Sequence, residues 1–353
     1  MRVLGRAPLL LLIAATACTG KSGSGFADDP GGGTDGGDQG DGGFVGTGDG
    51  GPGFGGEGGN PAPPDGSVTV TTTIYANTDD SLYSMDPSSH TVTLIGKFAG
   101  MGGGTGDSTV TDVAVDGAGD VYVNTESVIY KAAIPASPGT VQLTKVASIS
   151  VKSGQRFYAL AFAPAGVLGS GEALVGGDGN GELWSIDPSS GATKDLGSFG
   201  KDPRSASKVL ALSGDIVFYV DASNKPTGMA TIRSCASGGS TCDKTSDFLA
   251  GIDMTALAQA YASGTPAASL LGGIYGGSTG NPGAGTSFGE LFGLGAWQGS
   301  VFGFQRAPAL VSIDTGTGKA SPLGGSFSFT NGWSGAGVTT KVSINVPPPP
   351  PVK

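Results

Sequence analysis

Histidine and cysteine are scarce in this sequence, and their scarcity excludes several kinds of site. The 353 residues include one histidine and three cysteines. A cluster of imidazoles therefore cannot form, and no C-x-x-C pair has the spacing of a zinc site. Catalysis by two carboxylates that folding brings together stays open, because no spacing in a sequence identifies such a pair.

Basic residues are also few, and the chain has a formal net charge of −10. Residues 19–66 hold eight acids against Lys21 as their single base. Nucleic-acid-binding surfaces are basic, so we expect no nucleic acid among the partners.

No apolar run is long enough to cross a bilayer, which takes about 20 residues. The N-terminal run "LLLLIAA" follows Arg2 and Arg6 and has the layout of a secretory signal. It leads into "ATAC", which resembles the lipobox of bacterial lipoproteins, although Ala15 stands where that family usually has Leu. The resemblance implies cleavage just before Cys18 and acylation of its thiol. The alternative is an ordinary signal peptide that is cut after an A-x-A-like site.

The same resemblance predicts where the protein resides. Residues 1–17 would be the signal peptide, and the lipid on Cys18 would make the membrane a partner, since each buried methylene contributes about 0.8 kcal/mol. Thr19 follows the cysteine where the family's inner-membrane retention signal places Asp. We therefore expect an outer-membrane lipoprotein of the bacterial cell envelope.

The remaining cysteines, Cys235 and Cys242, are seven positions apart in "CASGGSTC". In an oxidising compartment this spacing favours a disulfide across a small polar loop. Free thiols and a metal site are the alternatives.

Residues 18–66 are glycine-rich, with scattered Asp and Pro, and cannot bury enough apolar surface to offset their chain entropy. We expect a disordered tether there. Asp35, Asp38 and Asp41 raise calcium binding as an alternative, but the alternating apolar position of calcium-binding nonapeptide repeats is absent. At the other terminus, residues 347–353 form a Pro-rich tail.

Three similar stretches define an internal repeat: "LYSMDPSSHTVTLIG" from Leu82, "LWSIDPSSGATKDLG" from Leu183 and "LVSIDTGTGKASPLG" from Leu310. Each predicts a strand, a turn opened by Asp and closed by a residue with positive φ, and a second strand. His90 occupies that last turn position in the first copy. We therefore expect the lone histidine to be a turn residue rather than a catalyst.

Fainter copies extend the repeat to five units of four short strands over residues 67–346. The chain begins on the second strand of a unit and ends on an inner strand. This arrangement resembles the β-propeller families whose blades read "LYxIDPxTG". The predicted fold is therefore all-β, a β-propeller of about five four-stranded blades closed by pairing of the first and last strands. A sixth blade that contains "SLLGGIYGG" is the alternative.

The fourth unit is the least regular. Its inner strand is expected from Val209, its second strand from Ile216, its third in "MATIRSC", and its outer strand after Cys242. Residues 253–264 have a helical pattern, with Asp253 as the N-cap, and are expected to form an insertion.

The starts of the five inner strands should surround one mouth of a central channel. Residues there combine both charges with aromatic rings, a mixture that suits a small polar ligand rather than a highly charged anion or a metal. The alternative is a set of separate solvated loop residues. The predicted ligand-binding residues are Asp112, Arg156, Tyr158, Lys208, Glu290, Asn331 and Trp333.

These features predict a lipid-anchored envelope β-propeller that binds a protein or a small polar ligand, without catalysis and without a cofactor. The alternative is a propeller hydrolase or lyase with an acidic, calcium-assisted site at the channel mouth. The stretch "DGNGE", residues 178–182, has part of a calcium loop but lacks its distal acid, so we expect a hairpin turn there.

Replacing the acylated residue tests the anchor. We expect Cys18→Ser to move the protein from the membrane fraction into the soluble fraction, because the variant lacks the thiol that would carry the lipid. Fractionation of cells followed by immunoblotting measures this. Unchanged membrane association would contradict lipid attachment.

Overall fold

The computed structural model describes residues 72–341 except 105, 151–154, 222, 224, 238–240, 276–287, 326, 328, 330 and 331. The predicted signal peptide, the predicted acylation site Cys18, the predicted tether to residue 66 and the Pro-rich tail lie outside the described residues. Within the described part, no helix has the length and apolar character needed to cross a bilayer.

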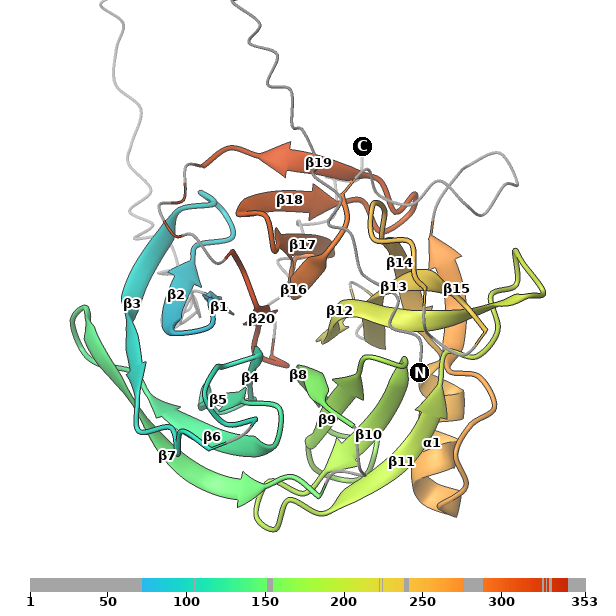
Figure 1. The fold of residues 1–353 in the computed structure, drawn as a ribbon, viewed down its shortest axis with the longest axis horizontal. Coiled ribbons are helices and arrows are strands. Elements are labelled where there is room, and N and C mark those ends of the chain that lie inside the picture. Colours follow the sequence, from blue (N-terminus) through green and yellow to red (C-terminus); the bar gives the residue numbers. More distant parts are fainter. Residues whose placement is uncertain are drawn as a thin grey trace, which may run out of the picture. The chain divides into compact units, whose positions relative to one another are not determined.

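The described chain is nearly all-β, and its strands surround a common centre in four layers (Figure 1). The inner strands are β4 (Asp112–Val115), β8 (Phe157–Ala163), β12 (Lys208–Val220), β16 (Leu291–Trp297) and β20 (Gly335–Gly337). The second strands are β1 (Ile74–Asn77), β5 (Val121–Asn124), β9 (Ala173–Asp178), β13 (Pro226–Ala236) and β17 (Ser300–Gln305). The third strands are β2 (Ser81–Met85), β6 (Val128–Ala133), β10 (Glu182–Ile186), β14 (Phe248–Ile252) and β18 (Ala309–Ile313). The outer strands are β3 (Val92–Ala99), β7 (Gly139–Ser148), β11 (Thr193–Ser198), β15 (Leu271–Tyr275) and β19 (Ala320–Leu323).

Three of the sheets have four antiparallel strands each: β8 to β11, β12 to β15, and β16 to β19. The remaining strands form one eight-stranded sheet in the order β20-β1-β2-β3-β7-β6-β5-β4. Within it, β20-β1-β2-β3 and β4-β5-β6-β7 are each antiparallel, and the parallel pairing of β3 with β7 joins them.

The two ends of the described chain meet in this sheet. Strand β20 pairs antiparallel with β1, with Tyr75 opposite Gly337 and Asn77 opposite Gly335. The sequence predicted this pairing, because the chain begins on a second strand and lacks an inner partner for it until the last unit.

The turn of the repeat has the expected geometry. Asp187 accepts hydrogen bonds from the backbone N–H groups of Ser189 (2.8 Å) and Ser190 (3.3 Å). The position that closes the turn has positive φ in every copy: 58° at His90, 72° at Gly191 and 66° at Gly318. His90 is therefore a turn residue in the structure, as predicted.

The predicted fourth unit is wrong in its strand assignments. The predicted inner strand from Val209 and second strand from Ile216 are one long strand, β12, and "SGD" between them is a bulge where the register shifts between Leu212 and Ile216. Thr231 stabilises the bulge, because its hydroxyl accepts from Asp215 N (3.1 Å) and donates to Leu291 O (3.0 Å). The true turn lies at Asp221, so "MATIRSC" belongs to the second strand β13.

The rest of that sheet follows from this shift. Strand β14 becomes the third strand, and "LGGIY", part of the stretch offered to a sixth blade, forms the outer strand β15. The helix between them, α1 (Met254–Ser263), was predicted: Asp253 caps its N-terminus and Gly264, with φ of 72°, ends it. It contacts β11 of the neighbouring sheet.

The core lies between neighbouring sheets rather than in one central mass. One cluster joins β1 and β2 to β16 through β18 around Trp333, and a second joins β8 through β11 to β12 through β14. Two smaller clusters lie on either side of β4 through β7. Strands such as β10 are consequently buried on both faces, which explains why "LWSI" is apolar with little alternation.

Close packing at the centre predicts the effect of one substitution. A Cβ at Gly335 would lie 2.0 Å from Oδ1 of Asp112 and 2.8 Å from Oδ1 of Asn77. We expect Gly335→Ala to lower the free energy of unfolding by about 1–3 kcal/mol, the usual cost of overpacking. Urea denaturation measures the loss. Gly104→Ala is the matched control, since a Cβ there meets no atom within 4 Å. Equal stability of the two variants would contradict tight closure.

Candidate functional site

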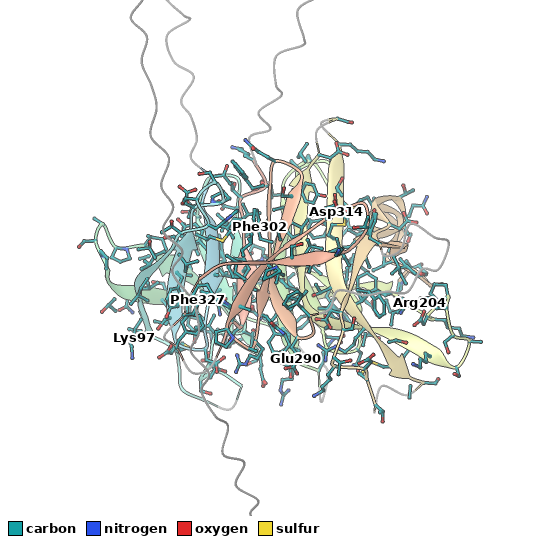
Figure 2. All side chains as sticks on the ribbon, turned by 90° about the horizontal axis from the view of Figure 1, so that it is seen from above. Lys97, Arg204, Glu290, Phe302, Asp314 and Phe327 are labelled. Carbon is teal, nitrogen blue, oxygen red and sulfur yellow. A yellow bond between two sulfur atoms is a disulfide. The ribbon has the colours of Figure 1, made fainter. Side chains whose placement is uncertain are left out.

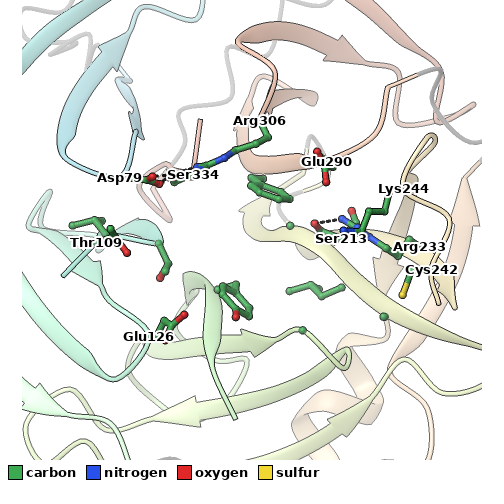
Figure 3. Close-up of a pocket in the computed structure, with 18 residues that line it drawn as sticks. Asp79, Thr109, Glu126, Ser213, Arg233, Cys242, Lys244, Glu290, Arg306 and Ser334 are labelled. Atoms are coloured by element: carbon green, nitrogen blue, oxygen red, sulfur yellow. Dashed lines mark hydrogen bonds and ion pairs between the residues drawn. The ribbon is translucent and has the colours of Figure 1, made fainter. Parts of the chain in front are cut away.

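A pocket of about 530 Å³ opens at the end of the ring where inner strands begin (Figure 3). Its walls come from loops and strand ends of all the sheets, including Thr109–Thr111 before β4, Tyr158 at the start of β8, and Glu290 with Phe292 at the start of β16. In a perpendicular view, Glu290 lies toward one side of the strands and the turn residue Asp314 toward the other (Figure 2). A concave site assembled from many loops is the usual location for ligand binding.

One wall joins the beginning of the described chain to its end. Nη1 and Nη2 of Arg306 donate to the carboxylate of Asp79, at 2.9 and 3.1 Å, and Nη1 also donates to Ser334 Oγ at 2.7 Å. The Ser334 hydroxyl in turn donates to Asp79 at 2.5 Å. Burial alone would raise the pKa of Asp79, but these hydrogen bonds outweigh it and hold the pKa below its ordinary value.

A second acid of the pocket is also paired. Glu126, in the turn between β5 and β6, forms an ion pair with Nε of Arg156 at 2.7 Å. Arg156 itself is not among the lining residues, so it neutralises Glu126 from outside the pocket. Tyr158, which is 42% exposed, adds an aromatic ring to the same wall.

The opposite wall holds three charged side chains that take part in none of these ion pairs: Arg233, Lys244 and Glu290 (Figure 3). Arg233 is only 7% exposed, and Nη2 donates to Ser213 O, but its Nε has no hydrogen-bond partner. Among the described residues, neither Lys244 nor Glu290 has an ion pair within 4.0 Å.

The backbone holds Glu290 in an unusual conformation. Its φ is 55°, in the left-handed region that costs a residue with a Cβ roughly 1–2 kcal/mol. Hydrogen bonds fix the segment: Arg306 N donates to Glu290 O at 2.9 Å and Gln305 Nε2 donates to Gly289 O at 2.9 Å. Strained non-glycine residues cluster at ligand-binding sites, where the surrounding structure maintains them.

The disulfide between Cys235 and Cys242 is present, as the spacing predicted. Cys242 lines the pocket two residues before Lys244, so the bridge ties this segment to β13. Closing so short a loop contributes about 2 to 3 kcal/mol on the chain-entropy estimate.

Two carboxyl groups lie buried beside the pocket. Asp112 follows the lining residue Thr111, Asp215 follows Gly214, and both are 0% exposed. Their side chains share a hydrogen bond. Each also ties its strand to the next sheet: Asp112 accepts from Leu160 N at 2.5 Å and Asp215 from Leu294 N at 2.6 Å.

Burial raises the pKa of both carboxyls, that of Asp215 to about 8. The pair therefore retains a shared proton near neutral pH, because two adjacent buried carboxylates cannot both ionise without a large electrostatic cost.

The predicted ligand-binding residues reach this region in different ways. Tyr158 and Glu290 line the pocket, and Arg156 stands behind it. Asp112 and Trp333 do not line the pocket, and both are fully buried. Successive side chains of an extended chain point to opposite sides, so their neighbours Thr111 and Ser334 line the pocket instead. Lys208 does not line the pocket either. It is the first residue of β12, and the part of this strand that lines the pocket is residues 211–214. Asn331 lies outside the described residues.

Sequence patterns did not mark five charged residues that line the pocket: Asp79, Glu126, Arg233, Lys244 and Arg306. Arg233 carried a signal, since it is a charge inside an apolar strand. The other four lie in turns or loops, where charged residues are common and mark no site.

Comparisons with known proteins found similarity to solved structures only. No protein-family model and no curated protein matches the chain. Among solved structures, a protein of unknown function from Bacteroides caccae aligns with 76% of this chain and 98% of its own, at 9% identity and a TM-score of 0.37. A structural genomics protein of unknown function from Bacteroides thetaiotaomicron aligns with 74% of this chain and 60% of its own, at 12% identity and a TM-score of 0.37. Similarities this distant carry no argument about function.

The buried pair predicts how stability depends on pH. A carboxyl whose pKa is raised on folding contributes stability that is fully present below its unfolded pKa, near 3.8, and is lost as the pH rises through the folded value. Asp247, whose pKa burial raises to about 6, contributes in the lower part of this range. We therefore expect the free energy of unfolding to fall between pH 6 and pH 8 through the Asp112–Asp215 pair.

Urea denaturation at a series of pH values measures this slope. Asp215→Asn removes one titrating group and should flatten it between pH 6 and pH 8. Asp187→Asn is the control, since the hydroxyl of Ser189 and nearby backbone N–H groups lower the pKa of that exposed carboxyl, and it should leave the slope unchanged. A wild-type profile that is level across this range would contradict the shared proton.

Proposed function

We propose that this protein is a lipid-anchored β-propeller of the bacterial outer membrane, with five four-stranded blades, whose pocket binds a small polar ligand without catalysis. The anchor follows from the lipobox resemblance at Cys18. The glycine-rich tether that follows would hold the folded part away from the bilayer.

The five-bladed assignment is supported by the order of the strands. Each proposed blade runs from an inner to an outer strand, and the eight-stranded sheet divides into two such blades at the parallel β3–β7 contact. Pairing of β20 with β1 completes the first blade from both ends of the chain. Closed rings of this kind leave only short sheet edges exposed.

The observation that carries the binding proposal is the pocket wall formed by Arg233, Lys244 and Glu290. Folding keeps these charged groups at a concave surface without pairing Lys244 or Glu290, and strain is maintained at Glu290. Charged groups held ready in this way favour a ligand that satisfies them.

The enzyme alternative receives less support. Two of the three acids that line the pocket, Asp79 and Glu126, are already paired with arginine, and the Asp112–Asp215 pair is fully buried. A calcium titration followed by thermal melting separates the two hypotheses, because a metal-assisted site would be stabilised by the ion.

A library of small polar molecules tests the binding proposal directly. The classes are sugars, dicarboxylates, polyamines and amino acids, and the measurement is the melting temperature of the purified protein. We expect at least one class to raise it, because a ligand that binds only the folded state stabilises that state.

A pocket-filling variant locates the effect. Thr109 is exposed and lines the pocket, so Thr109→Trp should abolish the stabilisation without disturbing the core. Thr144→Trp, at an exposed position of β7 away from the pocket, is the matched control and should respond like the wild type. The proposal fails if no class stabilises the protein, or if Thr109→Trp responds like Thr144→Trp.

A further inference from the structure

The charges of the pocket divide into those that are satisfied and those that are not. Asp79 is neutralised by Arg306, and Glu126 by Arg156, so these groups already have partners. Arg233, Lys244 and Glu290 lie together on one wall with charges of both signs (Figure 3). Lys244 and Glu290 have no ion pair among the described residues, and Arg233 interacts electrostatically with the buried Asp247 but keeps an Nε without a hydrogen-bond partner. A ligand for this wall must therefore present a negative and a positive group close together.

Arg233 is suited to the negative group. Its side chain is more than nine-tenths buried, and its orientation is set by the bond from Nη2 to Ser213 O, yet Nε has no partner. The planar fork of a guanidinium matches a carboxylate better than a single hydrogen-bond acceptor. Lys244, on the segment tied down by the disulfide, adds a second cation on the same side.

Glu290 is suited to the positive group. Its carboxylate has no ion pair or side-chain hydrogen bond among the described residues, and the hydrogen bonds of residues 289 and 290 fix the backbone from which it projects. The backbone of Lys244 packs against Gly289, where a Cβ would lie 2.0 Å from Lys244 O. The acid and the cation are thus held on adjoining segments.

We infer that the ligand is a small zwitterion of the α-amino acid class, whose carboxylate binds Arg233 and Lys244 and whose ammonium group binds Glu290. This inference rests on the proposed function of the pocket. A neutral sugar would leave Lys244 and Glu290 without an ion-pair partner and the Nε of Arg233 without a charged acceptor, and a dicarboxylate would be repelled by Glu290. Tyr158, Leu212 and Phe292 supply an apolar surface for a side chain.

Three matched probes test the inference on the purified full-length protein by isothermal titration calorimetry. They are L-phenylalanine, 3-phenylpropanoate, which lacks the amino group, and 2-phenylethylamine, which lacks the carboxylate. We expect L-phenylalanine to bind about tenfold more tightly than either analogue, since each analogue leaves one charged group of the wall unsatisfied.

Substitution of the acid assigns the ammonium group to Glu290. Glu290→Gln should weaken binding of L-phenylalanine about tenfold and leave binding of 3-phenylpropanoate unchanged. Glu126→Gln is the matched control, because that acid is already paired with Arg156, and it should not change the preference for L-phenylalanine. Both variants must show the wild-type unfolding curve in urea.

The outcomes separate the inference from the proposed function. The inference is overturned if 3-phenylpropanoate binds as tightly as L-phenylalanine, or if Glu126→Gln and Glu290→Gln behave alike. If no probe binds, but a sugar or dicarboxylate of the library stabilises the wild type and not Thr109→Trp, the inference fails and the binding function stands. If nothing in either set binds, both fail.

Discussion

The pairing of β20 with β1 is the contact on which the rest of the structure depends. It joins residues 75–77 to residues 335–337, and it gives β1 an inner strand to pair with. The same junction positions Ser334 for the Asp79–Arg306 network and places Gly335 against Asp112. Loss of this one pairing would therefore expose the edge of β1, disrupt one wall of the pocket and loosen part of the central packing.

Crowding at the centre explains the polar groups found there. Inner strands approach closely because several of their residues are Gly or Ala, and backbone N–H groups buried in this way still need acceptors. Asp112 and Asp215 supply them, each bonding an N–H of the following inner strand. Asn124 makes a comparable link, donating from Nδ2 to Phe157 O at 3.1 Å. These side chains connect sheets that share no backbone ladder.

How much could be predicted from the sequence differs between the fold and the site. The repeat predicted most strands and the closing pair, because strand alternation and the Asp turn are local features with fixed spacing. It failed at "SGD", where a tertiary contact from Thr231 makes a bulge out of residues that usually form a turn. The site was harder still. The position of the mouth followed from topology, but which of two adjacent residues faces it depends on strand register, as Thr111 and Asp112 illustrate.

The closing strands lie some 260 residues apart in the chain, and this separation governs the order of assembly. Ribosomes make β1 well before β20, so β1 has no inner partner while the intervening sheets form. An unpaired strand edge invites association with other chains, and contacts of high sequence separation form slowly. Closure must therefore wait until residues 335–337 have been made, and a chain truncated before residue 335 would keep a β1 that has no inner partner.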